Sequence, residues 1–167
     1  MDFIGKIYPP SSGQHCFIIV ATDYFTKWVK AIPLRSVTQA IVIKFIEEQI
    51  IHRFGLPESI TEDQGSVFIG SETLSFAESR GIKILNLTPY YAQANGQAEA
   101  TNKTVINIIE KMIKENPRSW DTVFSKALCT YRTSKRSSTG VTPFLLTYGQ
   151  DAMLAIKVLV RSTRRAL

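Results

Sequence analysis

The chain lacks the features that place a protein in a membrane or hold it together through a structural metal. No apolar run approaches the roughly 20 residues that a bilayer-spanning helix needs, and the N-terminus has neither the basic start nor the long apolar stretch of a signal peptide. Its two histidines and two cysteines do not show the spacing of a zinc site. We therefore expect a soluble intracellular protein without a structural zinc ion.

Cysteine is scarce, and both copies stand in apolar surroundings. Cys16 precedes the run Phe17-Ile18-Ile19-Val20, and Cys129 follows Ala127-Leu128. A free cysteine in such a context behaves as a small buried hydrophobe. We predict a structural rather than a catalytic role for both residues.

What the chain does have is enough apolar sequence for one core, together with an excess of positive charge. Of its 167 residues, 44% are hydrophobic and 20% are charged, which is sufficient for one globular domain. Its 20 basic residues against 14 acidic ones give a net charge of +6. An anionic partner is expected, and nucleic acid is the commonest one, although many basic domains bind none.

The first half of the chain predicts an α/β fold built on five strands. Apolar and turn-forming segments indicate strands at 2–7, 15–22, 27–32, 59–63 and 82–87 and helices at 36–54 and 73–79. Short links make the first three strands an antiparallel meander. The helix at 36–54, with a capping box at 36–39, returns the chain so that strand 59–63 is parallel to its neighbours. The expected sheet is mixed and five-stranded, in the order 3-2-1-4-5, with helices flanking it.

The second half predicts helices separated by loops. A segment rich in turn formers, 89–96, precedes a helix that starts at Glu99, and an amphipathic helix follows from about 116 to 132. The small residues at 94–96 are expected to leave Glu99 poorly placed until metal and DNA bind. Residues 1–150 are expected to form the core domain, and 151–167 a basic tail.

Three acidic residues stand in positions suited to a metal site. Asp63 ends the predicted strand 59–63, and ligands gather at the carboxyl ends of parallel strands. Glu99 opens a later helix, and Asp2 opens the first strand. Three carboxylates can hold two Mg²⁺ ions about 3.5–4 Å apart, a pair that activates an attacking oxygen and stabilises a leaving one in phosphoryl transfer.

Several phrases of the sequence, taken in order, resemble one family. They are Thr22-Asp23-Tyr24-Phe25-Thr26-Lys27-Trp28, Asp63-Gln64-Gly65-Ser66, Thr88-Pro89-Tyr90-Tyr91, Ala94-Asn95-Gly96-Gln97-Ala98-Glu99 and Thr142-Pro143-Phe144-Leu145-Leu146-Thr147-Tyr148-Gly149. Together with the spacing from aspartate to glutamate, they resemble the catalytic core of the integrase of gypsy-class LTR retrotransposons, which are relatives of retroviral integrases. The likeness runs from Asp2 to about Gly149.

The resemblance implies a ribonuclease H-like fold, an acidic triad at Asp2, Asp63 and Glu99, and Mg²⁺ as the cofactor with Mn²⁺ as a substitute. In the family, water attacks a phosphodiester near the element's 3′ end, and the freed 3′-hydroxyl then attacks target DNA. The implied partners are both DNAs and further copies of the core. The implied locations are cytoplasmic retroelement particles and, for action on chromosomal DNA, the nucleus.

Members of the family carry several residues before the first aspartate, and they carry further domains at both ends. Asp2 here follows only Met1. The chain is therefore expected to be an N-terminally truncated core with little activity of its own, because a fraying strand end holds a metal-binding carboxylate poorly.

Four residues are candidates for contacts with DNA: Asn102, Lys103, Lys135 and Arg136. Lys103 follows Glu99 by four residues, so these two could instead form an ordinary ion pair on a helix. The basic run 132–138 could equally be a solvated loop. The resemblance favours metal binding by Glu99 and phosphate contact by Lys103.

Two further acidic residues are not part of the predicted triad. Asp23 follows a strand at a turn, where aspartate usually hydrogen-bonds to the local backbone. Glu62 stands beside Asp63. Either its charge makes the ionisation of neighbouring acids more costly, or its side chain simply faces solvent.

Two other functions stay open from the sequence. A catalytically silent remnant of a decayed retroelement would keep a nucleic-acid-binding or self-associating surface without the chemistry. A ribonuclease H-type or transposase nuclease would share the fold but lack the phrases around Asp63 and Glu99. The preferred interpretation, ahead of both alternatives, is a metal-dependent polynucleotidyl transferase that cuts and joins DNA ends.

Overall fold

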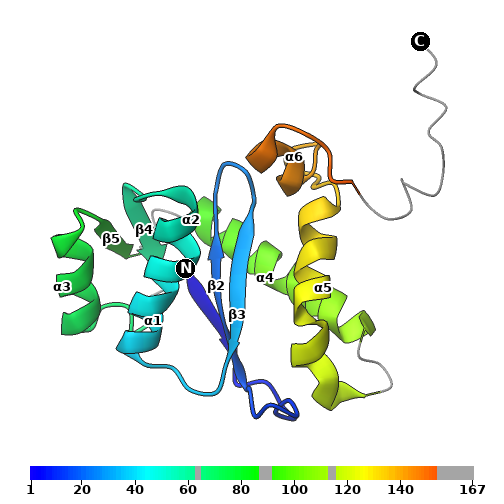
Figure 1. Ribbon diagram of the computed structural model, residues 1–167, viewed down its shortest axis with the longest axis horizontal. Coiled ribbons are helices and arrows are strands. Elements are labelled where there is room, and N and C mark those ends of the chain that lie inside the picture. The colour runs from blue at the N-terminus through cyan, green and yellow to red at the C-terminus, as the bar shows by residue number, and fades with distance from the viewer. Residues whose placement is uncertain (63–64, 87–91, 113–115, 154–167) are drawn as a thin grey trace.

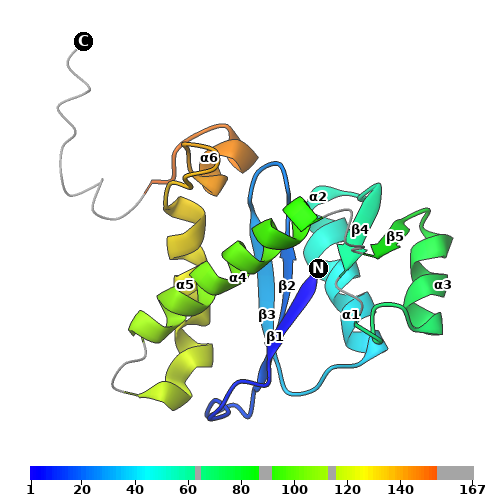
Figure 2. The ribbon, with the colours of Figure 1, turned by 180° about the vertical axis from the view of Figure 1, so that it is seen from behind.

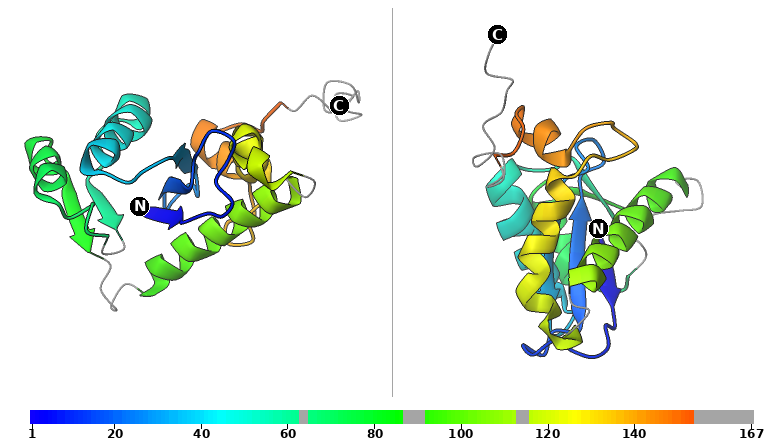
Figure 3. Two further views of the ribbon diagram at one scale, coloured as in Figure 1. Left: turned by 90° about the horizontal axis from the view of Figure 1, so that it is seen from below. Right: turned by 90° about the vertical axis from the view of Figure 1, so that its right-hand side faces the viewer.

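The computed structural model describes residues 1–62, 65–86, 92–112 and 116–153. It is an α/β structure in which strands and helices fall into two groups that lie side by side (Figure 1). Seen from below, helices α1 (Gln39–Phe45) and α3 (Ser71–Ser79) lie at one end of the molecule and the long helices α4 (Ala92–Met112) and α5 (Trp120–Thr133) at the other (Figure 3). Within the described chain, no helix combines the length and the apolar character needed to cross a bilayer.

The first three strands form the predicted antiparallel meander. These strands are β1 (Asp2–Gly5), β2 (Phe17–Thr22) and β3 (Val29–Leu34). They form one sheet in the order β1-β2-β3, with Asp2 paired to Val20 and Phe17 paired to Leu34. Alternate residues of β2 face opposite sides of this sheet, so Ile18 joins one core cluster and Ile19 the other.

The turn between β2 and β3 is organised by Asp23. Its Oδ1 accepts hydrogen bonds from the backbone N–H of Phe25 at 3.1 Å and from that of Thr26 at 2.6 Å, and also from the Thr26 hydroxyl at 2.7 Å. The structural role predicted for Asp23 is therefore confirmed.

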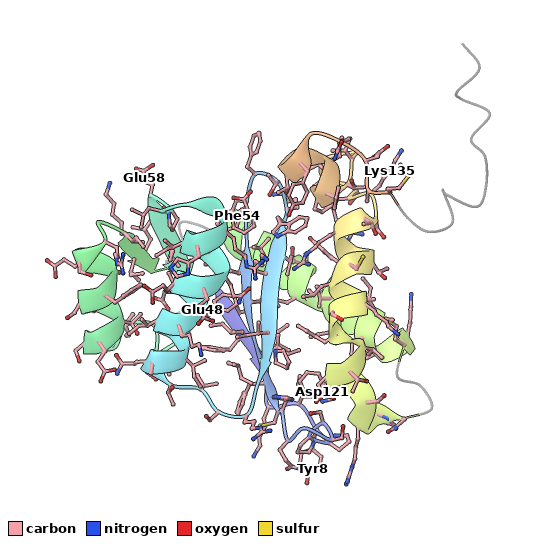
Figure 4. All side chains as sticks on the ribbon, viewed as in Figure 1. Tyr8, Glu48, Phe54, Glu58, Asp121 and Lys135 are labelled. Atoms are coloured by element: carbon pink, nitrogen blue, oxygen red, sulfur yellow. The ribbon has the colours of Figure 1, made fainter. Side chains whose placement is uncertain are left out.

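The segment between β1 and β2 is fastened to the start of α5 (Trp120–Thr133). Asp121 Oδ2 accepts a hydrogen bond from the Ser11 hydroxyl at 2.8 Å and lies 3.0 Å from His15 Nδ1. Figure 4 labels Asp121 beside this connection. Burial alone would raise the pKa of Asp121, but the hydrogen bonds from Ser11 and His15 outweigh burial and hold that pKa below its usual value.

The return helix has three parts: α1 (Gln39–Phe45), the π-helical stretch η1 (Ile46–Ile51) and α2 (His52–Phe54). The capping box predicted at 36–39 is wrong in its register. The N-cap is Thr38, whose hydroxyl accepts from the backbone N–H of Ile41 at 3.3 Å.

Gln39 caps a different helix, α3 (Ser71–Ser79). Its Oε1 accepts from the backbone N–H groups of Glu72 at 3.0 Å and Thr73 at 3.3 Å. Gly70 precedes α3, and a β-carbon there would clash with this same Oε1. A side chain from α1 thus satisfies N–H groups that the start of α3 leaves open.

The last two strands, β4 (Ser59–Glu62) and β5 (Lys83–Asn86), pair in parallel as predicted. They form a sheet of their own, so the single five-stranded sheet in the order 3-2-1-4-5 is not what the described residues show. The ammonium group of Met1 donates a hydrogen bond to the Thr61 carbonyl oxygen and links the two sheets.

Helices occupy the remainder of the chain. After α4 (Ala92–Met112) come the 3₁₀ turn η3 (Pro117–Ser119), α5 and α6 (Pro143–Tyr148). Helix α4 crosses one face of the three-stranded sheet (Figure 2). The loop predicted at 89–96 is wrong for residues 92–96, which are helical, whereas 89–91 lie outside the described residues. Alanine and glutamine at 92–94 are good helix formers and extend the helix toward its start.

The two cysteines differ in their surroundings. Cys16 is buried as predicted, but Cys129 is exposed, so the prediction of burial is wrong for Cys129. Helix α5 turns Leu128 and Tyr131 into the core. A residue between two buried positions of an amphipathic helix faces outward despite its apolar neighbours.

Candidate functional site

Asp2 lies at the start of β1 and is held by a residue of α4. Its Oδ2 accepts a hydrogen bond from Asn102 Nδ2 at 2.5 Å, and its Oδ1 accepts from the backbone N–H of Phe3 at 2.7 Å. Asp2 is half-buried and Asn102 is buried. An amide donor therefore fixes one oxygen of a carboxylate that is still accessible.

Helix α4 carries the second predicted acid. Glu99 occupies the position one helical turn before Asn102, although its side chain lies outside the described residues. Residues three apart on a helix are neighbours on its surface. The backbone of α4 thus places the position of Glu99 close to the residue that holds Asp2, while its pairing with Lys103 stays a prediction.

The third predicted acid, Asp63, lies outside the described residues, immediately after the end of β4. The preceding residue, Glu62, is fully buried, and its Oε2 accepts a hydrogen bond from the backbone N–H of Gly65 at 3.1 Å. The interpretation that Glu62 faces solvent is therefore wrong. Its buried carboxylate ties the end of β4 to the turn that follows.

Of the three predicted metal ligands, Asp2 is the one whose side chain the structure describes, and that side chain suits a hard cation. In the ranges 1–62, 65–86, 92–112 and 116–153, no group of three or more His, Cys, Asp or Glu side chains could hold a metal ion. Asp2 itself fits, because it is a half-buried carboxylate oriented by an amide, and outer hydrogen bonds of this kind fix metal ligands. The triad of Asp2, Asp63 and Glu99 stays a prediction.

A basic hollow of about 420 Å³ lies beside α4. Its lining includes the cations Lys27, Lys135 and Arg136, together with Thr104 of α4. Lys135 is exposed and lies near α6 (Figure 4). We call this cavity, together with the Lys27, Lys135, Arg136 and Thr104 side chains that line it, the basic hollow. The structure thus brings together three cations from the β2–β3 turn and the segment after α5.

The arrangement differs from the sequence expectation at two positions. Lys27 was not predicted as a DNA contact. Its place in the first of the family phrases could have indicated that it belongs to the site. Lys103 is exposed on α4 but does not line the basic hollow. Asn102 contacts Asp2, which the sequence did not show, and its DNA contact stays a prediction.

The Asn102 amide gives a first testable prediction. We expect Asn102→Ala to lower the free energy of unfolding by about 1.5–3 kcal/mol relative to Asn107→Ala, because only Asn102 donates to a carboxylate. Asn107 is exposed on the same helix, so it controls for the change in helix propensity. Urea unfolding of the two variants measures the difference. Equal stabilities would contradict the role assigned to Asn102.

Comparison with known proteins decides the family. A family model described as the integrase core domain matches residues 1–92, more than half of the chain. The chain belongs to the integrase core family. The predicted resemblance to integrases of LTR retrotransposons and retroviruses is confirmed.

Relatives of this integrase core occur in retroviral and transposon polyproteins. The chain is 32% identical over 149 residues to the Gag-Pol polyprotein of avian reticuloendotheliosis virus, covering 89% of the chain and 13% of that protein. It is 29% identical over 156 residues to the Tf2-3 polyprotein of Schizosaccharomyces pombe, covering 93% of the chain and 12% of that protein. The chain therefore spans about an eighth of the length of these relatives.

Solved structures agree on the fold. The catalytic core domain of HTLV-2 integrase in complex with magnesium, in a trimeric form, matches with a TM-score of 0.65 at 25% identity, covering 78% of this chain and 83% of that one. The core domain of BIV integrase matches with a TM-score of 0.68 at 19% identity, covering 86% and 89%. The predicted ribonuclease H-like α/β class is confirmed at this level, and the strand order is not.

Proposed function

We propose that this integrase core is a metal-dependent polynucleotidyl transferase that processes DNA 3′ ends and joins them to target DNA. The observation that carries the proposal is the hydrogen bond from Asn102 to Asp2. It connects the strand that holds one predicted metal ligand to the helix that holds another. The HTLV-2 integrase core, whose structure contains magnesium, supports Mg²⁺ as the cofactor, with Mn²⁺ as a substitute.

Asp2, Asp63 and Glu99 would hold the metal ions. When bound, two such ions would supply a Lewis acid for the attacking oxygen and another for the leaving oxygen of the phosphodiester. Asn102 keeps one Asp2 oxygen directed, so the carboxylate needs less reorganisation on binding. Glu62, the residue before Asp63, accepts a hydrogen bond from the backbone N–H of Gly65.

The basic hollow would hold the DNA backbone beside this centre. Lys27, Lys135 and Arg136 supply positive charge, and Thr104 supplies a hydroxyl on α4. Phosphate contacts of this kind position the duplex without reading its sequence. Lys103, exposed on α4, and Asn102 are proposed as further contacts.

Binding to DNA ends is the direct test of this surface. We expect weak binding. The logarithm of the association constant should fall linearly with the logarithm of the salt concentration, because each neutralised phosphate releases counterions. Lys135→Gln should lower the steepness of that dependence by about 0.9, the value for one lost phosphate contact. Fluorescence anisotropy with a labelled duplex end, at several salt concentrations, measures both quantities.

The matched control is Lys83→Gln. Lys83 is an exposed lysine of β5, in the other group of elements, and should leave the salt dependence unchanged. Binding that does not change between low and moderate salt would instead indicate a protein partner.

Self-association and cellular location complete the proposal. Solved relatives include dimeric and trimeric forms of the HTLV-2 integrase core and an intasome of simian T-cell lymphotropic virus. We propose that this core also forms homo-oligomers on DNA. It would assemble in cytoplasmic retroelement particles and act on chromosomal DNA in the nucleus.

A further inference from the structure

The basic hollow is built from three segments that lie far apart in the sequence. Lys27 comes from the β2–β3 turn, Thr101 and Thr104 come from α4, and residues 135–138 follow α5. Among the described residues that line the hollow, none is an acid and none belongs to β1 or β4. Cations of two different segments can therefore reach one anionic group in the hollow.

Arg136 is held in place by its own loop and by a buried ring. Its backbone N–H donates to the carbonyl oxygen of Val141 at 3.0 Å, and its carbonyl oxygen accepts from the N–H of Gly140 at 2.8 Å. Its Nε donates to the carbonyl oxygen of Ser134 at 3.2 Å, and its guanidinium carbon lies 4.5 Å from the centre of the Tyr131 ring. Because Tyr131 is a buried residue of α5, the ring that supports the guanidinium is itself fixed.

These contacts use only one of the three guanidinium nitrogens of Arg136. Its Nη1 and Nη2 make no hydrogen bond to the part of the chain that the structure describes. Among the ion pairs of the described residues, none includes Lys135 or Arg136. An oriented guanidinium binds two oxygens of one phosphate at once, whereas a lysine acts as a point charge. Arg136 is thus the residue that can fix the orientation of a phosphate here, and Lys27 and Lys135 add charge.

We propose that the basic hollow binds the terminal 5′-phosphate of a DNA end, which presupposes the DNA-end chemistry of the proposed function. A phosphate monoester carries about −1.5 to −2 charges at pH 7 and three acceptor oxygens. An internal phosphodiester carries about one negative charge. Three cations around one hollow match the monoester better than they match single charges spaced along a backbone.

The position of the hollow on α4 agrees with an end rather than an internal stretch of DNA. Thr101 lines the hollow, and the next residue, Asn102, donates to Asp2. When a 3′ end lies at the metal centre, the 5′ end of the complementary strand lies one base pair away, beside the same helix. The 5′-phosphate then holds the duplex end in register while the 3′ end reacts.

The test uses a DNA hairpin that is labelled in its loop and has one free duplex end, carrying a 5′-hydroxyl, a 5′-phosphate or a 3′-phosphate. In fluorescence anisotropy, we expect the wild-type chain to bind the 5′-phosphate end at least about fivefold more tightly than the 5′-hydroxyl end. The 3′-phosphate places the same charge on the other strand and should add less than about twofold. An equal gain from the 3′-phosphate would overturn the assignment to the 5′ end.

Variants of the arginine and of its supporting ring separate bidentate binding from charge. Arg136→Lys keeps the charge but loses the paired donors, so it should reduce the preference for the 5′-phosphate to about twofold or less. Tyr131→Phe should retain the preference because the ring stays, and Tyr131→Leu should reduce it. Arg118→Lys, at an exposed arginine of η3, is the matched control and should behave like the wild type. A full preference in Arg136→Lys, or in Arg136→Gln, would overturn the proposal.

A terminal phosphate can belong to a DNA end or to a free nucleotide, and competition with dAMP separates the two. We expect the unlabelled 5′-phosphate hairpin to displace the labelled one at a concentration at least about 100-fold lower than dAMP requires, because the duplex makes further phosphate contacts. Displacement at equal concentrations would overturn the assignment to a DNA end.

The same titrations distinguish failure of this proposal from failure of the proposed function. Equal affinities for the 5′-phosphate and the 5′-hydroxyl end, with the salt dependence of binding retained, would overturn only the role of the 5′-phosphate. Failure of every hairpin to bind would contradict the proposed function and this role together.

Discussion

Asp63→Asn is expected to remove most of the response of the folded protein to Mg²⁺ or Ca²⁺ without unfolding it. Altering a residue that only orients a metal ligand costs roughly 10–100-fold in affinity, so loss of a ligand carboxylate should cost at least about 100-fold. Because the ions would activate the attacking oxygen, activity on DNA should fall with metal binding. Titrating the cation while recording amide chemical shifts measures the first effect, and a strand-joining assay the second.

The control for Asp63→Asn is Glu110→Gln, which also removes one negative charge. Glu110 is exposed on α4 and belongs to no predicted site, so the cation response should be that of the wild type. A wild-type response that persists in the double variant Asp63→Asn, Glu99→Gln would disprove the metal assignment. Loss of the metal response with DNA binding intact would show that the two sites act separately.

Adding strand-forming residues before Met1 is expected to raise activity on a pre-assembled branched DNA substrate by tenfold or more. Asp2 pairs with Val20, so residues added ahead of Met1 would lie opposite Thr22 and beyond. On the other side, the Met1 ammonium already contacts the Thr61 carbonyl oxygen. An extended strand could pair with both neighbours and hold Asp2 rigidly, as a metal ligand requires.

The chain as given should show little 3′-end processing or joining, and Mn²⁺ should support more activity than Mg²⁺. Mg²⁺ demands near-ideal octahedral geometry, which a carboxylate at a strand end supplies poorly. An extension of equal length made of glycine and serine is the control, because it adds residues without strand propensity. Equal and robust activity in all three proteins would show that the argument about Asp2 is wrong. Absence of activity in every form, with DNA binding retained, would favour the catalytically silent remnant.

The same extension tests the sheet. If it pairs with β2 and β4, the two sheets should join in the order 3-2-1-4-5. Hydrogen exchange at the backbone amides of residues 59–62 would then slow markedly, because the free edge of β4 would become hydrogen-bonded to the extended strand. Unchanged exchange would leave the two separate sheets as the stable arrangement.

Local patterns in the sequence determined much of this fold. Runs of apolar residues bounded by turn formers were enough to predict the three antiparallel strands, the return helix and the parallel pair. Asp23 could be assigned to a turn because its hydrogen bonds reach only two and three residues along the chain. Interactions of such short range depend on neighbours in the sequence, and the sequence displays those neighbours directly.

The candidate site was predicted only as residue types in family phrases. The sequence pointed to Asp2, Asp63 and Glu99, but it did not show that Asn102 holds Asp2 across 100 positions of the chain. It pointed to Lys135 but not to Lys27, which reaches the basic hollow from the β2–β3 turn. Contacts of this kind depend on how β1, α4 and the turns meet in space.

Tertiary packing also decided the elements on which local patterns failed. Gln39 looked like a cap for its own helix, yet it caps α3, because α1 and α3 lie side by side. Glu62 could have faced solvent on a free strand, but packing around β4 buries it. Helical periodicity shows which residues share a face, but not what stands opposite that face. The sequence by itself therefore determined most of the elements, the family and the candidate acids. The tertiary structure alone decided which carboxylates are buried, which cations converge and which side chain holds Asp2, because each of these depends on contacts between segments far apart in the chain.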